Sequence, residues 1–164
     1  IPDKDLPNEK NKSEFYKLLN IHLNKLSKNY KKKVVICLHP KTNYQDVKKY
    51  FNKYICKKFK TFDYMHKAFL IVCIASTSVA YGIYNKKKIL IVNSKNLKNF
   101  IQHSSEMLAT NYNLKSINLD DTKINNLNIN NINTKIPYKI LKKNVVYDQK
   151  ISGDLKIINT IKKI

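Results

Sequence analysis

The stretch LIVCIASTSVAYGIY, residues 70–84, decides the fold, because an apolar run passes through three hydroxyl side chains into a second apolar run with helical spacing. The continuously apolar segment Leu70–Ile74 is typical of a strand that is covered on both faces in a parallel sheet. A helix is expected over Ser78–Tyr84 and the next strand over Lys88–Val92. A strand, a helix and a further strand in this order are the repeating unit of parallel α/β folds.

The same alternation extends to both sides of this unit. The elements expected upstream are a helix, a strand, a longer helix, a marginal strand and a short helix, over Ser13–Leu26, Val34–Leu38, Tyr44–Ile55, residues 58–62 and Tyr64–Phe69. Ser13 and Asp63 are the expected caps of the first and last of these helices. A helix over Lys98–Tyr112 and a strand over Lys115–Leu119 are expected downstream. The sequence therefore predicts an α/β fold, a Rossmann-like parallel sheet flanked by helices.

The length of the chain, 164 residues, suits one compact domain with a buried core. Residues 1–30 are expected to form a leading helical segment. Residues 121–164 are expected to form an Asn-rich connection with terminal helices over 136–143 and 152–164. Because the chain begins with Ile1 rather than Met, we expect it to be a piece of a longer protein.

The net charge of +21 arises from 32 cations, all of which are lysines. Proteins that read nucleic acid usually use Arg for bidentate contacts, so the lack of Arg makes a nucleic-acid partner a weak prediction. The clusters Lys31–Lys33 and Lys86–Lys88 are expected to attract anions, including an anionic membrane leaflet. The alternative for each cluster is the solvated end of a strand or helix.

Three cysteines with no CxxC pair make disulfides and a zinc site poor predictions. Cys37 and Cys73 fall in expected strands and fit small core residues in a reducing compartment. The longest apolar run, Ala68–Ala75, is too short to cross a bilayer. The expected location is cytoplasmic, with peripheral association with the inner membrane left open.

The familiar catalytic motifs are missing from the sequence. With only Gly82 and Gly153 in the chain, neither a Gly-rich dinucleotide loop nor a P-loop can form. The sequence contains no HExxH, no GxSxG and no cluster of acidic metal ligands, so it has no hydrolase signature. The chemistry that remains is the binding of an anion.

Two strand ends carry the side chains for that chemistry. Ser76, Thr77 and Ser78 follow one expected strand, and the pair His39-Pro40 follows another. In open α/β sheets ligands bind beyond the carboxyl ends of the strands, so these side chains are expected to meet one ligand. The alternatives are ordinary helix capping for the hydroxyls and a histidine bound to a backbone group for His39.

The motifs VVICLHP (34–40) and TFDYMHKAFLIVCIASTSVAYGIYNKKKILIV (61–92) resemble the C-terminal half of bacterial sialyltransferases and polysialyltransferases. The resemblance implies one half of a GT-B glycosyltransferase, the half that holds a CMP-activated sugar. It also implies that His39 contacts the CMP phosphate as the catalytic histidine, that Ser76, Thr77 and Ser78 hold the same phosphate, and that no metal ion or other cofactor takes part.

The acidic motif that supplies the general base in this family belongs to a preceding domain, and Asp3 and Asp5 do not match it. The resemblance therefore implies a nucleotide-sugar donor, a glycan acceptor and a missing N-terminal domain or partner chain as partners. Sialic acid is the favoured sugar, in the synthesis of surface polysaccharide or lipooligosaccharide. The alternatives are a domain that transfers a polyol phosphate from a CDP-linked donor, and a non-catalytic basic module that binds nucleic acid or anionic lipid.

Overall fold

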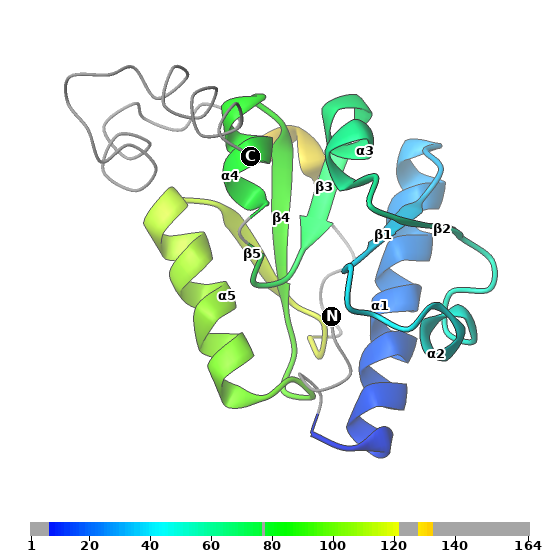
Figure 1. Ribbon diagram of the computed structural model, residues 1–164. Coiled ribbons are helices and arrows are strands. Elements are labelled where there is room, and N and C mark those ends of the chain that lie inside the picture. The colour runs from blue at the N-terminus through cyan, green and yellow to red at the C-terminus, as the bar shows by residue number, and fades with distance from the viewer. Residues whose placement is uncertain (1–6, 77, 122–127, 133–164) are drawn as a thin grey trace, which may run out of the picture.

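The computed structural model describes residues 7–76, 78–121 and 128–132. Its elements, in chain order, are α1 (Glu9–Tyr30), β1 (Val35–Leu38), α2 (Tyr44–Lys48), β2 (Ile55–Lys58), α3 (Thr61–Lys67), β3 (Leu70–Cys73), α4 (Val79–Tyr84), β4 (Lys88–Asn93), α5 (Asn99–Tyr112), β5 (Lys115–Asn118) and the 3-10 helix η3 (Ile129–Asn131) (Figure 1). Strand β1 pairs with β2, and β4 pairs with both β3 and β5, all in parallel. The predicted mixed α/β fold with Rossmann-like parallel pairing is confirmed, although the strands form a 2-stranded and a 3-stranded sheet rather than one sheet.

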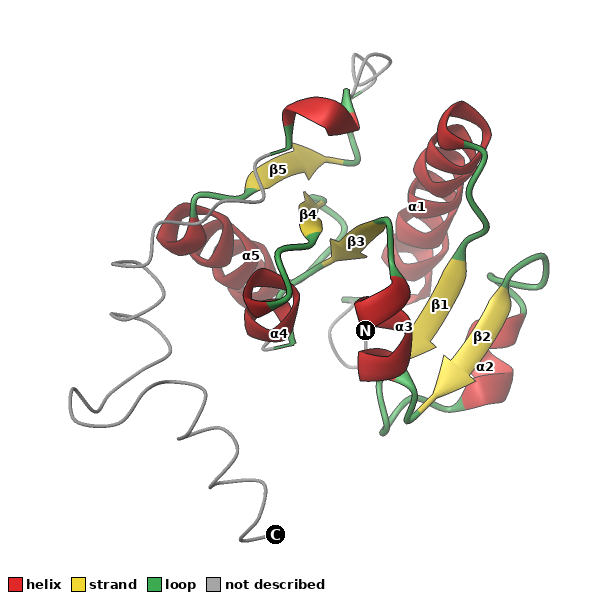
Figure 2. Ribbon diagram, turned by 90° about the horizontal axis from the view of Figure 1, so that it is seen from above, coloured by secondary structure: helices red, strands yellow, loops and turns green. Residues whose placement is uncertain are grey.

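The two sheets are separate, and in both Figure 1 and Figure 2 the 2-stranded sheet lies on the β3 side of the 3-stranded sheet, with β1 nearer to β3 than β2 is. Alternate residues of β4 enter different cores. Leu90 and Val92 belong to a cluster with residues of α1 and α2. Ile89 and Ile91 belong to a cluster with residues of α3, α4 and α5. Helices therefore cover both faces, which explains why the central strand is apolar at consecutive positions.

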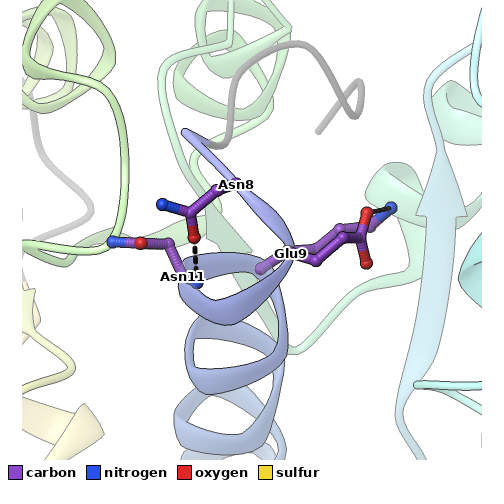
Figure 3. A network of polar contacts seen from close by, with 4 residues as sticks. Asn8, Glu9 and Asn11 are labelled. Carbon is purple, nitrogen blue, oxygen red and sulfur yellow. Dashed lines mark hydrogen bonds and ion pairs between the residues drawn. The ribbon is translucent and has the colours of Figure 1, made fainter.

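The first helix begins earlier than predicted, because Asn8 and not Ser13 caps it. The Asn8 backbone is extended, and its Oδ1 accepts a 2.9 Å hydrogen bond from the Asn11 N–H (Figure 3). Asn is as good an N-cap as Ser, since its side chain satisfies one of the unpaired N–H groups of the first turn. Glu9 in that turn lies 3.3 Å from Lys12 Nζ. An earlier cap of equal quality therefore extends the helix.

The predicted helix Tyr44–Ile55 is wrong over its second half, because α2 ends at Lys48 and Ile55 begins β2. Val47 and Phe51 of this segment are nevertheless buried, and Tyr50 and Tyr54 are half-buried against the same core. The Tyr50 ring stacks on Tyr16 of α1 with centroids 4.4 Å apart, and Phe51 meets the same ring edge-on at 5.2 Å. Pairing of Ile55–Lys58 with β1 satisfies backbone groups on both strands, and this tertiary contact outweighs local helical preference.

The short strand predicted at residues 58–62 is also displaced, because the strand ends at Lys58 and α3 begins at Thr61 rather than at Tyr64. Phe59 has a φ of 56°, which turns the chain out of the strand. Asp63 does not cap the helix but lies in its first turn, where its Oδ2 is 3.5 Å from Lys60 Nζ.

Helix α4 lies very close to the sheet at Gly82. A Cβ at this position would be 2.9 Å from Ile71 Cδ1 and 3.1 Å from Ile89 Cδ1, so a larger side chain would require the ends of these two Ile side chains to shift. Helix α5 forms where it was predicted, but two of its large apolar residues are exposed, Phe100 at 57% and Met107 at 49%. Ser105 and Ala109 of α5 are buried instead.

No helix of the described ranges is long and apolar enough to cross a membrane. The terminal helices predicted over 136–143 and 152–164 lie outside the described residues.

Candidate functional site

The loops that follow β1 and β3 leave neighbouring strand ends toward opposite faces of the molecule. The loop after β1 leads to α2, whose Val47 packs into the core with α1. The loop after β3 leads to α4, whose Val79 and Ile83 pack into the other core. In open α/β sheets, ligands bind where successive connections diverge in this way. The sequence-predicted residues His39, Ser76 and Ser78 all lie on these two loops.

His39 begins a tight turn at the end of β1. The Thr42 N–H donates to the His39 carbonyl at 2.9 Å, with Pro40 at the position of the turn that favours proline. The Lys41 N–H donates to His39 Nδ1 at 3.1 Å. Because Nδ1 accepts this bond, the neutral ring carries its proton on Nε2. The exposed imidazole therefore offers Nε2–H as a donor to a ligand.

Thr42 closes this turn with a buried hydroxyl. The residue is 4% exposed, and within the described ranges its Oγ1 has no hydrogen-bond partner. A buried polar group without a partner typically costs about 1–3 kcal/mol. Lys41, beside it, is exposed and adds a cation to the turn. The turn thus combines a ring donor, a cation and an unused hydroxyl within four residues of sequence.

The serine turn after β3 is held together by its own hydroxyls. Ser76 Oγ and Ser78 Oγ are 2.7 Å apart, and the Ser78 N–H donates to Ser76 Oγ at 3.3 Å. Only one hydroxyl hydrogen is used between the two side chains, so the other remains for a ligand. Thr77, the third predicted residue, lies outside the described residues.

Ser78 occupies the N-cap position of α4 but does not cap the helix. Its φ and ψ of −65° and −12° are helical, and its side chain makes no capping hydrogen bond. The capping alternative therefore does not account for the Ser78 hydroxyl. Helix α4 has only 6 residues, so its macrodipole is small and the hydroxyls are the main donors of the turn.

Ser105 is a site-supporting residue that the sequence did not reveal. It is fully buried in α5, and its Oγ accepts a 3.1 Å hydrogen bond from the Ala75 N–H, next to the serine turn. The available signal was a polar residue on the same helical stripe as Ile101 and Ala109.

The end of β4 carries a polar network that is satisfied within itself. Asp120 accepts hydrogen bonds from the Lys95 N–H at 2.7 Å and from Asn96 Nδ2 at 3.2 Å. The Asn93 side chain donates to Glu106 Oε1 at 3.2 Å. These bonds hold the end of β4 to α5 and to the segment that follows β5. They therefore fix the strand end next to β3, the strand that leads into the serine turn.

The cysteines near the site are not activated. Burial raises the pKa of the Cys37 thiol in β1, and raises the pKa of Cys73, at the end of β3, to about 12. Thiols with such pKa values stay protonated at neutral pH and are poor nucleophiles. Among the residues that the structure describes, no group of three or more His, Cys, Asp or Glu side chains is arranged to hold a metal ion.

The structure thus joins Ser76 to Ser78 directly, while the His39 turn follows β1 of the other sheet, with no hydrogen bond between His39 and either serine in the described part of the chain. His22 lies on α1 with its Nε2 3.2 Å from the Leu119 carbonyl oxygen. Comparison of the chain with protein-family models, with curated proteins and with solved structures finds no match.

Proposed function

We propose that this chain is the donor-nucleotide domain of a glycosyltransferase that uses a CMP-activated sugar. The observation that carries the proposal is that two donor-bearing turns, one with His39 and one with Ser76 and Ser78, each follow the carboxyl end of a parallel strand, with connections that lead to opposite faces. The paired hydroxyls and the Nε2–H of His39 are the kind of donors that a phosphate binds. The resemblance of residues 34–92 to bacterial sialyltransferases adds the nucleotide and the favoured sugar, sialic acid.

The proposed chemistry is the departure of CMP from the anomeric carbon of the sugar. The bond from that carbon to the phosphate oxygen breaks, and a bond to the acceptor hydroxyl forms. Negative charge then grows on the phosphate, where His39 and the serine hydroxyls donate hydrogen bonds that strengthen as the charge develops. The acceptor proton passes to a base on a preceding domain or a partner chain, so this chain alone binds the donor but transfers sugar poorly or not at all.

The test is a CMP titration monitored by calorimetry. We expect His39→Ala, Ser76→Ala and Ser78→Ala each to weaken CMP binding by roughly tenfold, the usual effect of one lost hydrogen bond to a charged group. His103→Ala is the matched control, because His103 is equally exposed but lies on α5. Unchanged affinity in all three site variants removes the proposed phosphate site.

Two other functions are separated by the choice of ligand. A domain that uses a CDP-linked polyol prefers CDP over CMP, and UDP reports on the selectivity for the base. A basic module without a nucleotide site binds DNA or anionic vesicles in a steeply salt-dependent manner, shows little nucleotide selectivity and is indifferent to the serine variants.

A further inference from the structure

We propose that Phe59 and Phe62 form a stacking surface for the nucleobase of the bound nucleotide. This inference rests on the proposed function, since it assigns a place to the base of a ligand whose phosphate meets His39, Ser76 and Ser78. It concerns a part of the surface that bears no hydrogen-bonding side chain of the candidate site.

Phe59 leaves the sheet beside His39. The last paired residues of the 2-stranded sheet are Leu38 in β1 and Lys58 in β2, and the next residues along the two chains are His39 and Phe59. Figure 2 shows the two strands ending side by side, with α3 following directly. The imidazole and the phenyl ring therefore belong to the same edge of the sheet.

The conformation of Phe59 has no explanation in packing. The residue is 76% exposed and has a φ of 56°, a left-handed conformation that bulky residues rarely adopt. An exposed aromatic ring loses the benefit of burial, and a strained backbone costs about 1–3 kcal/mol. A ligand that covers the ring would offset both costs.

Phe62 continues the aromatic surface toward the serine turn. It is 57% exposed, and its ring meets Tyr81 of α4 edge-on with centroids 4.8 Å apart. The Tyr81 N–H in turn donates to the Ser78 carbonyl at 3.1 Å. Phe62 is thus linked through Tyr81 to the serine turn, and Phe59, three residues earlier in the chain, follows the strand end beside His39.

A nucleoside monophosphate has the chemistry that fits this arrangement. Its phosphate is an anion for the two turns, and its base is a planar ring that stacks on aromatic side chains. Lys58 Nζ lies 5.9 Å from the Phe59 ring centroid, so a cation borders the same surface. Phenylalanine offers no hydrogen bonds, and the surface therefore supplies affinity for a base without choosing among bases.

The test compares a ligand that has a base with one that lacks it. We expect Phe59→Ala and Phe62→Ala to weaken CMP binding roughly 5- to 100-fold each, the range measured for one base stacked on one aromatic residue. Binding of ribose 5-phosphate should not change in either variant. Phe100→Ala is the matched control, since Phe100 is also 57% exposed but lies on α5.

A fluorescence experiment tests the contact directly. The chain contains no Trp, so Phe59→Trp introduces a single indole. We expect CMP to quench its emission with an affinity close to that of the wild type, and ribose 5-phosphate to leave the emission unchanged.

The outcomes separate this inference from the proposed function. If CMP binds and His39→Ala weakens it, but Phe59→Ala and Phe62→Ala do not, the stacking surface is refuted and the phosphate site stands. If the wild type does not bind CMP at all, both proposals fail. Equal losses for CMP and ribose 5-phosphate, or self-association that Phe59→Ala abolishes while CMP affinity is unchanged, also overturn the stacking surface.

Discussion

The hydroxyl of Ser105, buried in the middle of α5, accepts a 3.1 Å hydrogen bond from the backbone N–H of Ala75. Ala75 immediately precedes Ser76, so a residue 30 positions away in the sequence fixes the start of the serine turn. A loop anchored in this manner presents its donors in a set geometry, which a phosphate site requires.

Ser105→Ala should therefore affect both stability and ligand binding. We expect the free energy of unfolding to fall by about 1–2 kcal/mol, because the Ala75 N–H loses its partner in a partly buried position. CMP affinity should fall as well, since the serine turn becomes less ordered. Ser104→Ala is the neighbouring control, because the Ser104 hydroxyl is exposed and bonds only to the Phe100 carbonyl. Denaturant unfolding and CMP titration of the two variants give the comparison, and equal behaviour of both variants contradicts the anchoring role.

Thr42→Val should stabilise the free protein. The Thr42 hydroxyl is buried and has no hydrogen-bond partner among the residues that the structure describes, and Val keeps the shape of the side chain while removing the unsatisfied group. We expect the free energy of unfolding to rise by about 1 kcal/mol. If CMP binding weakens in the same variant, the hydroxyl serves the ligand. Thermal melts with and without CMP measure both effects, and a large destabilisation of the free protein would show that the hydroxyl has a partner.

The hydrogen-bond network at the end of β4 depends on Asp120. Asp120→Ala removes the acceptors of the Lys95 N–H and of Asn96 Nδ2, and Asn96 is only 7% exposed. We expect a loss of about 1–3 kcal/mol in the free energy of unfolding. Asp63→Ala is the control, since its ion pair with Lys60 is exposed at both ends and such pairs contribute little. Urea unfolding of the two variants should give clearly different midpoints.

The parts of the fold that the sequence predicted correctly are those in which one segment decides its own structure. The strands β1, β3 and β4 are runs of Ile, Val and Leu, and their apolar character at consecutive positions is visible without knowledge of any neighbour. The errors in the predicted elements occur where contact with another segment of the fold determines the secondary structure. Ile55–Lys58 is a strand because β1 lies beside it, which helical spacing in residues 44–55 does not reveal.

The candidate site shows the same division. His39, Ser76 and Ser78 follow recognisable strands, so their positions just beyond the carboxyl ends of those strands could be predicted from the sequence. Ser105 and Phe59 could not, because their importance arises from contacts across the fold and from a backbone angle. Whether His39 and the serines share a ligand stays a prediction.

The stability of the protein should fall with rising pH above pH 9 because of Cys73. Burial raises the pKa of this thiol from 9.0 to about 12. Between these values the unfolded chain loses the proton while the folded chain keeps it, so unfolding becomes more favourable by about 1.4 kcal/mol per pH unit. Below pH 9 both states are protonated and the contribution is constant. Urea unfolding at pH 8, 9 and 10 should show a steeper loss in the wild type than in Cys73→Val, and parallel slopes would contradict the buried thiol.

A basic edge opposite the candidate site should bind anionic membranes. Lys32 Nζ and Lys88 Nζ lie 5.6 and 5.4 Å from the ring centroid of Phe69, which is 41% exposed. Lys32 and Phe69 precede β1 and β3, and Lys88 is the first residue of β4, so all three lie at the amino ends of the strands. Clustered lysines around an exposed aromatic ring suit an anionic bilayer surface, at about 1 kcal/mol per lysine.

The measurement is co-sedimentation with phosphatidylglycerol vesicles, using phosphatidylcholine vesicles as the neutral reference. We expect Lys32→Gln combined with Lys88→Gln to weaken binding to anionic vesicles about 30-fold, the equivalent of roughly 2 kcal/mol. The pair Lys48→Gln and Lys53→Gln, both on exposed lysines, is the charge-matched control. CMP affinity should stay unchanged in both double variants, because the nucleotide turns lie at the carboxyl ends of the strands. An equal loss in the control means that total charge, rather than this edge, governs the attraction, and stronger binding to duplex DNA than to vesicles assigns the edge to nucleic acid instead.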